Sequence, residues 1–168
     1  MATTNSFDVS TGCDLQEVDN AVNQALKEIG QRYDFKGSKC EIVFDRPKAE
    51  IRLLADDDFR MDALVDVLRT RLIKRSVPVK NLKFGDREPA ANSAVRSTVA
   101  LTQGIPADTA RQIVKSIKDN KAFRKVTASI QGDEVRVASP SRDDLQTVIA
   151  ALKAEDFGVE LKFGNYRS

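Results

Sequence analysis

The chain has 168 residues, and its 27 Lys and Arg residues nearly balance 25 Asp and Glu residues, leaving a formal net charge of +2. That balance does not by itself indicate a nucleic-acid-binding protein, and 41% apolar with 31% charged residues is typical of a globular chain. The sequence contains no histidine, which excludes imidazole acid–base catalysis, His-activated nucleophiles and His-ligated zinc.

The cysteine content and the first residues indicate a cellular compartment. Only Cys13 and Cys40 occur, which is no disulfide framework and suits a reducing cytosol. Residues 1–5 lack the basic and apolar regions of a secretory signal. No stretch approaches the roughly 18 apolar residues of a membrane span. We therefore expect a cytoplasmic protein that does not enter a membrane.

The first half of the chain shows six regular elements in order. Alternation predicts a strand over 6–10, and Asp14 caps a helix that runs to about Gly30. A charged and aromatic connection over 32–39 follows. Two strands are predicted over 40–44 and 49–54, a helix opens at 56–58 and runs to about Lys74, and 80–84 forms a last strand.

The second half repeats this pattern. Glu134–Val137 matches Glu50–Leu53, and the apolar positions of the following helices correspond at the same offset. Strands are predicted over 97–101, 126–130, 134–137 and 159–163, with helices opened by Pro106 and Ser141. The chain is an internal duplication.

The order β-α-β-β-α-β in each half predicts a ferredoxin-like sheet with both helices on one face. The fold class is therefore α+β, a tandem duplication of two ferredoxin-like (βαββαβ) domains. We expect the domains over 1–88 and 93–168, with 85–92 as the best linker candidate. Modules of about 80 residues are marginal alone, so we expect them to pack on each other.

A set of motifs spread over nearly the whole chain resembles the YajQ family. The motifs are Phe7–Ser10, Arg32–Gly37, Gln103–Ile105, Ile113–Lys115, Ile130–Val137 and Ser141–Gln146. The resemblance implies two ferredoxin-like domains that exchange their first strands, with 6–10 in the second sheet and 97–101 in the first. It also implies a cytosolic nucleotide-binding protein; some members of the family act as cyclic-di-GMP effectors and others are linked to RNA.

Topology brings three connections to one end of each sheet, and these carry the candidate ligand-binding residues. An aromatic ring or a guanidinium can stack on a purine, Lys and Arg neutralise phosphate, and Arg can read guanine bidentately. A carboxylate can accept from guanine N1 and N2. The candidates are Arg32, Asp34, Phe35, Lys36, Phe123, Arg124 and Arg142. The alternative is that the rings plug the ends of the modules while the charges stay solvated.

Two basic clusters lie toward helix C-termini. Lys115 and Lys118 share a helical face with Arg111, which makes this stripe a phosphate candidate. A further cluster comprises Arg69, Arg71, Lys74 and Arg75. The alternative for both is a solvated face, since cations are favoured at helix C-termini.

The run Asp56–Asp58 has the chemistry to bind a hard cation, but it lacks the spaced ligands and the glycine of a calcium loop. We expect it to cap the second helix instead. The common phosphate-cradling motifs GxxxxGKS/T and GxGxxG are absent from the sequence. We expect no catalytic residues, no metal and no resident cofactor.

The sequence thus predicts a non-enzymatic nucleotide-binding protein for a guanine-type ligand, with cyclic-di-GMP as the form that the resemblance suggests and a protein partner, such as a transcription regulator, downstream. One alternative is RNA binding through basic helix faces; a stacking platform on the sheet is disfavoured because the third strands, 51–54 and 135–137, are aliphatic. The other alternative is a module that binds only proteins.

Overall fold

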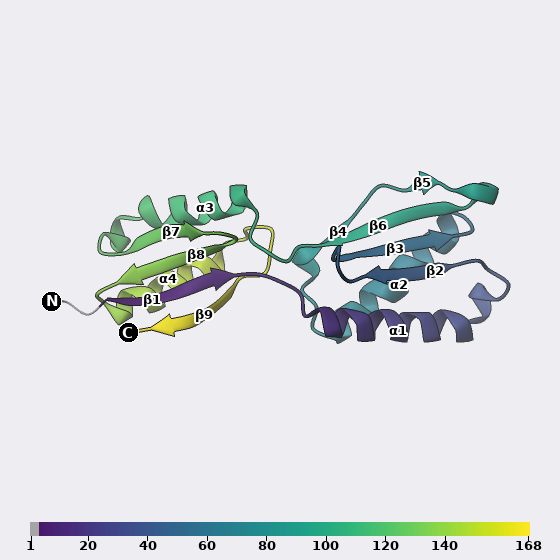
Figure 1. Cartoon of the computed structure of the whole chain (residues 1–168), viewed down its shortest axis with the longest axis horizontal. Helices are drawn as coiled ribbons and strands as arrows, with labels where there is room; N and C mark the ends of the chain where they lie inside the picture. Colours follow the sequence, from purple (N-terminus) through teal and green to yellow (C-terminus); the bar gives the residue numbers. More distant parts are fainter. Residues whose placement is uncertain (1–3) are drawn as a thin grey trace. The chain divides into compact units, whose positions relative to one another are not determined.

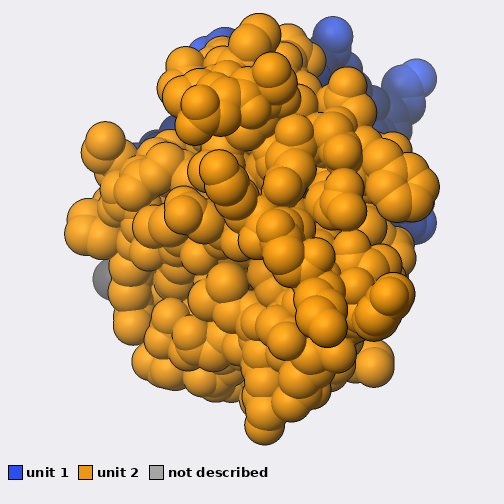
Figure 2. All heavy atoms as spheres, turned by 90° about the vertical axis from the view of Figure 1, so that its right-hand side faces the viewer, with its two compact units in different colours: residues 1–12, 104–168 blue, residues 13–103 orange. Residues whose placement is uncertain are grey.

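The computed structural model of the protein describes residues 4–168. The chain forms two compact units (Figures 1 and 2). Unit 1 comprises the described residues through Gly12 together with 104–168, and unit 2 comprises 13–103. Within the described chain, none of the helices has the length and apolar character needed to cross a bilayer.

Unit 2 is an antiparallel sheet covered by two helices. Its strand order is β2-β3-β6-β4, with the short β5 paired to β6. The strands are β2 (Glu41–Asp45), β3 (Glu50–Ala55), β4 (Leu82–Phe84), β5 (Glu88–Pro89) and β6 (Val95–Leu101), and the helices are α1 (Leu15–Gln31) and α2 (Asp58–Lys74).

Unit 1 repeats the arrangement with the strand order β7-β8-β1-β9. Its strands are β1 (Asn5–Ser10), β7 (Thr127–Gln131), β8 (Glu134–Ser139) and β9 (Lys162–Arg167), and its helices are α3 (Ala107–Lys118) and α4 (Arg142–Ala154). Each unit thus holds two helices and an antiparallel sheet, of four strands in unit 1 and of five in unit 2 because β5 is added, which confirms the α+β fold of two ferredoxin-like units.

The central strand of each sheet comes from the other half of the sequence. β1 lies between β8 and β9 in unit 1, and β6 lies between β3 and β4 in unit 2. The compact units therefore differ from the sequence modules 1–88 and 93–168. The chain passes from one unit to the other at Gly12–Cys13 and again at Gln103–Gly104.

The segment predicted as a linker is instead a hairpin within unit 2. Glu88 pairs with Arg96, and the Gly85 amide donates to the carbonyl of Thr98 at 2.8 Å. A Cβ on Gly85 would lie 2.9 Å from that carbonyl oxygen, so only glycine fits without a shift. Its Pro and Ala content suggested a linker, but the backbone hydrogen bonds of 85–96 place it in the sheet.

The helix starts follow the predicted caps. The Asp14 carboxylate accepts from the Gln16 and Glu17 amides, and Ser141 Oγ accepts from the Asp144 amide at 3.2 Å. Asp57 caps α2 by accepting from the Arg60 amide at 2.8 Å, which confirms the capping role of the acidic run.

The predicted last strand, 159–163, is displaced: Gly158 turns with φ +82°, and pairing with β1 begins only at Lys162.

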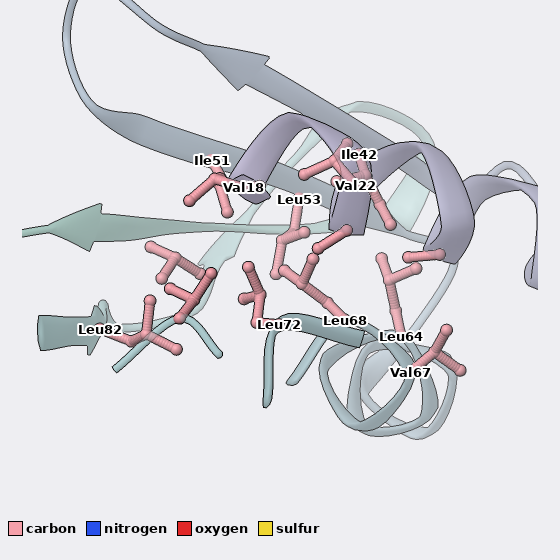
Figure 3. Close-up of a cluster of buried hydrophobic side chains, with 14 of the residues drawn as sticks. Val18, Val22, Ile42, Ile51, Leu53, Leu64, Val67, Leu68, Leu72 and Leu82 are labelled. Carbon is pink, nitrogen blue, oxygen red and sulfur yellow. The ribbon is translucent and has the colours of Figure 1, made fainter. Parts of the chain in front are cut away.

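The core of unit 2 lies between the helices and one sheet face (Figure 3). Ile51 and Leu53 of β3 point toward Leu64, Leu68 and Leu72 of α2. All five are at most 2% exposed. Burial of each such side chain contributes about 1.5–3 kcal/mol relative to leaving it in water. A second core in unit 1 is built on Phe7 and Val9 of β1.

We predict that Leu68→Ala lowers the free energy of unfolding by about 2–5 kcal/mol, because it removes a fully buried side chain and leaves a cavity. The control is Ile73→Ala on the same helix, where the side chain is 51% exposed; it should change stability by less than about 1 kcal/mol. Urea unfolding followed by circular dichroism measures both. Equal losses for the two variants would contradict the assigned core.

Candidate functional site

Strand register gathers three connections of unit 1 at one end of its sheet. Thr127 lies opposite Ala138, Asn5 opposite Ser139, and Ser6 opposite Arg167. The α3–β7 connection, the turn before α4 and the end of β9 therefore share that end (Figure 1). This is the arrangement that the ferredoxin-like order predicts.

A cavity of about 250 Å³ opens there, between the first turn of α4 and the strands β1 and β9. Arg142 lines it and is held by two neutral acceptors: its Nε donates to Asn5 Oδ1 at 3.4 Å, and its Nη2 donates to Ser168 Oγ at 2.9 Å. Neither acceptor neutralises the guanidinium charge. The Arg167 side chain also lines the cavity and makes no hydrogen bond or ion pair within residues 4–168, although its charge helps to lower the pKa of Asp8. The cavity thus holds two cations without paired acids, and we call it the Arg142 pocket.

Tyr166 supplies an aromatic surface to the Arg142 pocket. Its ring centroid lies 6.2 Å from that of Phe7, tilted by 43°, while 62% of the residue remains exposed. Phe7 is fully buried and makes a second, edge-on contact with Phe163. The tyrosine therefore rests against a rigid support and leaves most of its surface free for stacking.

A polar network on β1 holds the end of β9 in position. Asp8 accepts from Arg136 Nε at 3.0 Å and from Asn165 Nδ2 at 2.5 Å. The pairing of β9 with β1 shifts its register between Ser6 and Asp8, and Asn165 has φ +54°. The hydrogen bond from Arg136 holds the pKa of the Asp8 carboxyl below its usual value; burial opposes this effect, and Asn165 adds to it. The network fixes the irregular backbone immediately before Tyr166.

The predicted loop over 32–36 lies at the end of unit 2, and Arg32 and Asp34 within it form an ion pair. Arg32 donates to both carboxylate oxygens of Asp34, at 3.0 and 2.6 Å, and this pairing lowers the pKa of Asp34. Phe35 is only 5% exposed and belongs to the core. Lys36 is exposed and has no charged partner within residues 4–168. In this conformation only Lys36 and the neighbouring Tyr33, 88% exposed, are open to a ligand.

The connection between α3 and β7 also has a buried ring followed by an exposed cation. Phe123 is 6% exposed and packs in the core of unit 1, so like Phe35 it is closed to stacking on a base. Arg124 is exposed and has no hydrogen-bond or ion-pair partner in the described chain. Its connection precedes β7, at the edge of the sheet opposite β9. The structure therefore brings Arg142 together with Tyr166 and Arg167, not with Phe123 and Arg124.

The two basic clusters have different surroundings. On α3, Lys115 and Lys118 are exposed and unpaired within residues 4–168, whereas Arg111 pairs with Asp108. On α2 the cations are occupied within unit 2: Arg71 binds Glu28 at 2.6 Å, and Arg75 lies 3.4 Å from a Glu17 oxygen. The α2 cluster is therefore mostly structural, and the α3 stripe remains open.

Tyr166, Arg167 and Gln146, which also lines the pocket, were not among the predicted site residues. The prediction ended the last strand at Phe163, three residues too early to put Tyr166 on the sheet. The sequence signal for this part of the pocket is the aromatic–basic pair Tyr166–Arg167. It is the same kind of pair that singled out 35–36 and 123–124.

The Arg142 pocket has no counterpart in unit 2. At the position equivalent to Arg142 stands Asp58, which pairs with Arg87 at 3.2 Å. Asp56 accepts from the Lys39 amide at 2.7 Å. Within residues 4–168, no group of three or more His, Cys, Asp or Glu side chains is placed to hold a metal ion. The duplicated fold therefore carries different chemistry at its two ends.

These features define a class of protein: two ferredoxin-like units, one of which carries an arginine- and tyrosine-lined pocket at the end of its sheet. The chain belongs to the YajQ-like family of nucleotide-binding proteins, whose model, described as "Nucleotide-binding protein YajQ-like", matches residues 5–167.

Similar proteins cover the chain almost end to end. A nucleotide-binding protein of Desulforamulus reducens is 50% identical over 168 residues, covering 100% of this chain and 99% of the relative. One from Syntrophotalea carbinolica is 52% identical, with 97% and 99% covered, and one from Trichlorobacter lovleyi is 49% identical, with 96% and 98% covered. The family likeness therefore extends over both units.

We predict that the Asp8 network makes folding stability depend on acid pH. The folded pKa of Asp8 lies below its ordinary value of 3.8, so the carboxylate stabilises the fold above that value, and this contribution is lost as the pH falls through the folded pKa. Asp8→Asn should lower stability near pH 7 and lose less further stability than the natural chain between about pH 5 and 2. Urea unfolding at several pH values measures this.

The control for the loss of one negative charge is Asp66→Asn, at an exposed position of α2 without an ion-pair partner in the described chain. An Asp8→Asn protein whose stability follows the same pH curve as the natural chain would exclude this role for the network.

Proposed function

We propose that the Arg142 pocket binds a guanine nucleotide, that cyclic-di-GMP is the ligand in the cell, and that the protein passes this signal to a protein partner. The observation that carries the proposal is the convergence of Arg142, Arg167 and Tyr166 on one cavity. The membership of a nucleotide-binding family supports the ligand class.

Each part of a nucleotide has a matching group in the pocket. The two guanidinium groups present forked donors that suit phosphate oxygens, and a guanidinium can also donate to guanine O6 and N7. The exposed face of Tyr166 suits stacking on a base. The volume of about 250 Å³ is smaller than the roughly 300–1,000 Å³ of pockets that enclose drug-sized ligands. We therefore expect one base to enter and the rest of a dinucleotide to stay outside, where a partner can contact it.

The residues that line the Arg142 pocket favour ligand binding over catalysis. Its hydroxyl groups, on Ser6, Tyr166 and Ser168, have no histidine, lysine or carboxylate beside them in the lining to act as a general base. A receptor without catalysis is the proposal that fits this set. The receptor would pass its signal on by binding a protein partner, such as a transcription regulator.

We predict that Arg142→Ala weakens nucleotide binding about 10- to 150-fold, because hydrogen bonds to a charged group are worth about 1.5–3 kcal/mol. Tyr166→Ala should weaken it about 5- to 150-fold through lost stacking, worth about 1–3 kcal/mol per base. Calorimetric titration with cyclic-di-GMP, GTP and GMP measures these changes and ranks the ligands.

Two variants in unit 2 serve as controls. Arg46→Ala removes an exposed cation far along the chain from the pocket, and Tyr33→Ala removes the other tyrosine, which lies in the 32–36 loop with Lys36. Both should bind as the natural chain does. Loss of binding in Tyr33→Ala with retention in Tyr166→Ala would move the site to Arg32, Asp34 and Lys36 and overturn the Arg142 pocket. The absence of heat with every nucleotide would overturn the function.

RNA binding is the second candidate, favoured by the unpaired Lys115 and Lys118 on α3. If the stripe contacts RNA phosphates, Lys115→Ala and Lys118→Ala should each weaken binding and reduce the dependence of log affinity on log salt by about 0.7 for single strands. Fluorescence anisotropy with a labelled RNA over a series of salt concentrations measures this. Arg46→Ala, which removes an exposed cation of unit 2 outside the stripe, is the control. A flat salt response would exclude this route.

A further inference from the structure

A second cavity lies in unit 2, under the hairpin that joins β5 to β6. Its volume is about 380 Å³, and its lining comes from the segment before β2, the end of β3 with the residue after it, the hairpin turn and the start of β6. We call it the hairpin pocket. None of its lining residues belongs to the Arg142 pocket, which lies in unit 1.

Small apolar side chains form much of its wall. Ala90, Ala91 and Ala94 contribute from the hairpin and Leu54 from β3. Leu54 lies opposite Arg96 in the β3–β6 register, on the sheet face that points away from the buried Leu53. Three alanines together with a half-buried leucine present an apolar surface without long side chains, which suits a flat ring.

Two cations border this surface. Lys39 is exposed, and its ammonium has no hydrogen-bond or ion-pair partner within residues 4–168. Arg96 lies 3.3 Å from Glu88, but the two side chains are 63% and 65% exposed, so water competes with this pair. Both cations are thus available to a phosphate group.

The hairpin pocket also contains a carboxylate. Asp56 lines the pocket and is half-buried. Its Oδ1 accepts from the Lys39 amide at 2.7 Å and lies 3.9 Å from Cys40 Sγ. Its second oxygen takes no hydrogen bond from the described chain. A carboxylate held by its backbone contact, with one oxygen free, is an acceptor for the ring N–H and amino groups of a purine.

The hairpin that covers the pocket is held in an unusual conformation. Asn92 and Ser93 have φ of 59° and 62°, in the left-handed region that residues other than glycine rarely adopt. The turn is closed by the hydrogen bond from the Ala90 amide to the Ala94 carbonyl at 2.8 Å.

We propose that the hairpin pocket is a second ligand site, which takes a purine nucleoside monophosphate. The ring lies against the alanines and Leu54, Asp56 accepts from its edge, and Lys39 and Arg96 hold the phosphate. The site is separate from the Arg142 pocket and does not depend on it, so a single chain binds two nucleotides at chemically different sites.

The test is a titration of the ¹⁵N-labelled full-length chain with GMP, followed by amide chemical shifts. The amides of Lys39, Asp56 and 91–94 should shift as one saturable set, with an affinity different from that of the set around Arg142. Inorganic phosphate alone should shift the hairpin set much more weakly, because it lacks the ring.

Two variants probe the hairpin pocket. Lys39→Glu should weaken GMP binding at the hairpin set at least about tenfold, because an attractive charge becomes a repulsive one. Lys48→Glu, at the exposed β2–β3 turn, is the matched control and should leave it unchanged. Ala94→Leu should fill the cavity and abolish the shifts, while Ala100→Leu, exposed on the same strand as Arg96 and outside the lining, should not.

The outcomes separate this proposal from the function proposed for the Arg142 pocket. Shifts confined to the Arg142 set overturn the hairpin site and leave that function standing. Shifts confined to the hairpin set support the hairpin site, and the function of the Arg142 pocket is then decided by its own titration with cyclic-di-GMP. Equal responses to GMP and inorganic phosphate, unchanged binding in Lys39→Glu, or no response at either set would overturn the hairpin site.

Discussion

The insertion of β1 between β8 and β9 is the constraint on which unit 1 and its pocket depend. Phe7 and Val9 are fully buried in the core, and Asp8, between them, holds Arg136 on one neighbour and Asn165 on the other. Three residues of this short strand also support the pocket. Asn5 holds Arg142, Phe7 carries the ring of Tyr166, and Asp8 fixes the irregular backbone before it.

The duplication has kept the fold and changed the surfaces. Hydrophobic cores tolerate sequence change as long as pattern and volume are kept, so Glu50–Leu53 and Glu134–Val137 still occupy equivalent strands. The sheet ends carry no such constraint. Arg142 in one unit corresponds to Asp58 in the other, and the hairpin of 85–96 belongs to unit 2.

The sequence anticipated part of the proposed Arg142 pocket. Arg142 was found because a capping box located the start of its helix, and the register of the sheet then fixed its end of the unit. Phe35 and Phe123 were identified as aromatic loop residues, but burial, which no local pattern reveals in a loop, closes both rings to a ligand. Asp34 was predicted as a base acceptor, yet Arg32, two residues earlier, takes both of its oxygens. Tyr166 was missed because the last strand begins later than its apolar alternation indicated.

The sequence by itself determined the helices, their caps, most strands and the duplication, because these depend on side-chain periodicity and on contacts within a few residues. Its family motifs determined the nucleotide-binding class. Only the tertiary structure decided which strands pair, since β1 and β8 meet across more than a hundred residues, and which charges remain unpaired. The pockets follow from that pairing. Arg142, Arg167 and Tyr166 converge in one cavity, and Lys39, Asp56 and Arg96 in another, because strand register, not sequence spacing, sets their separations.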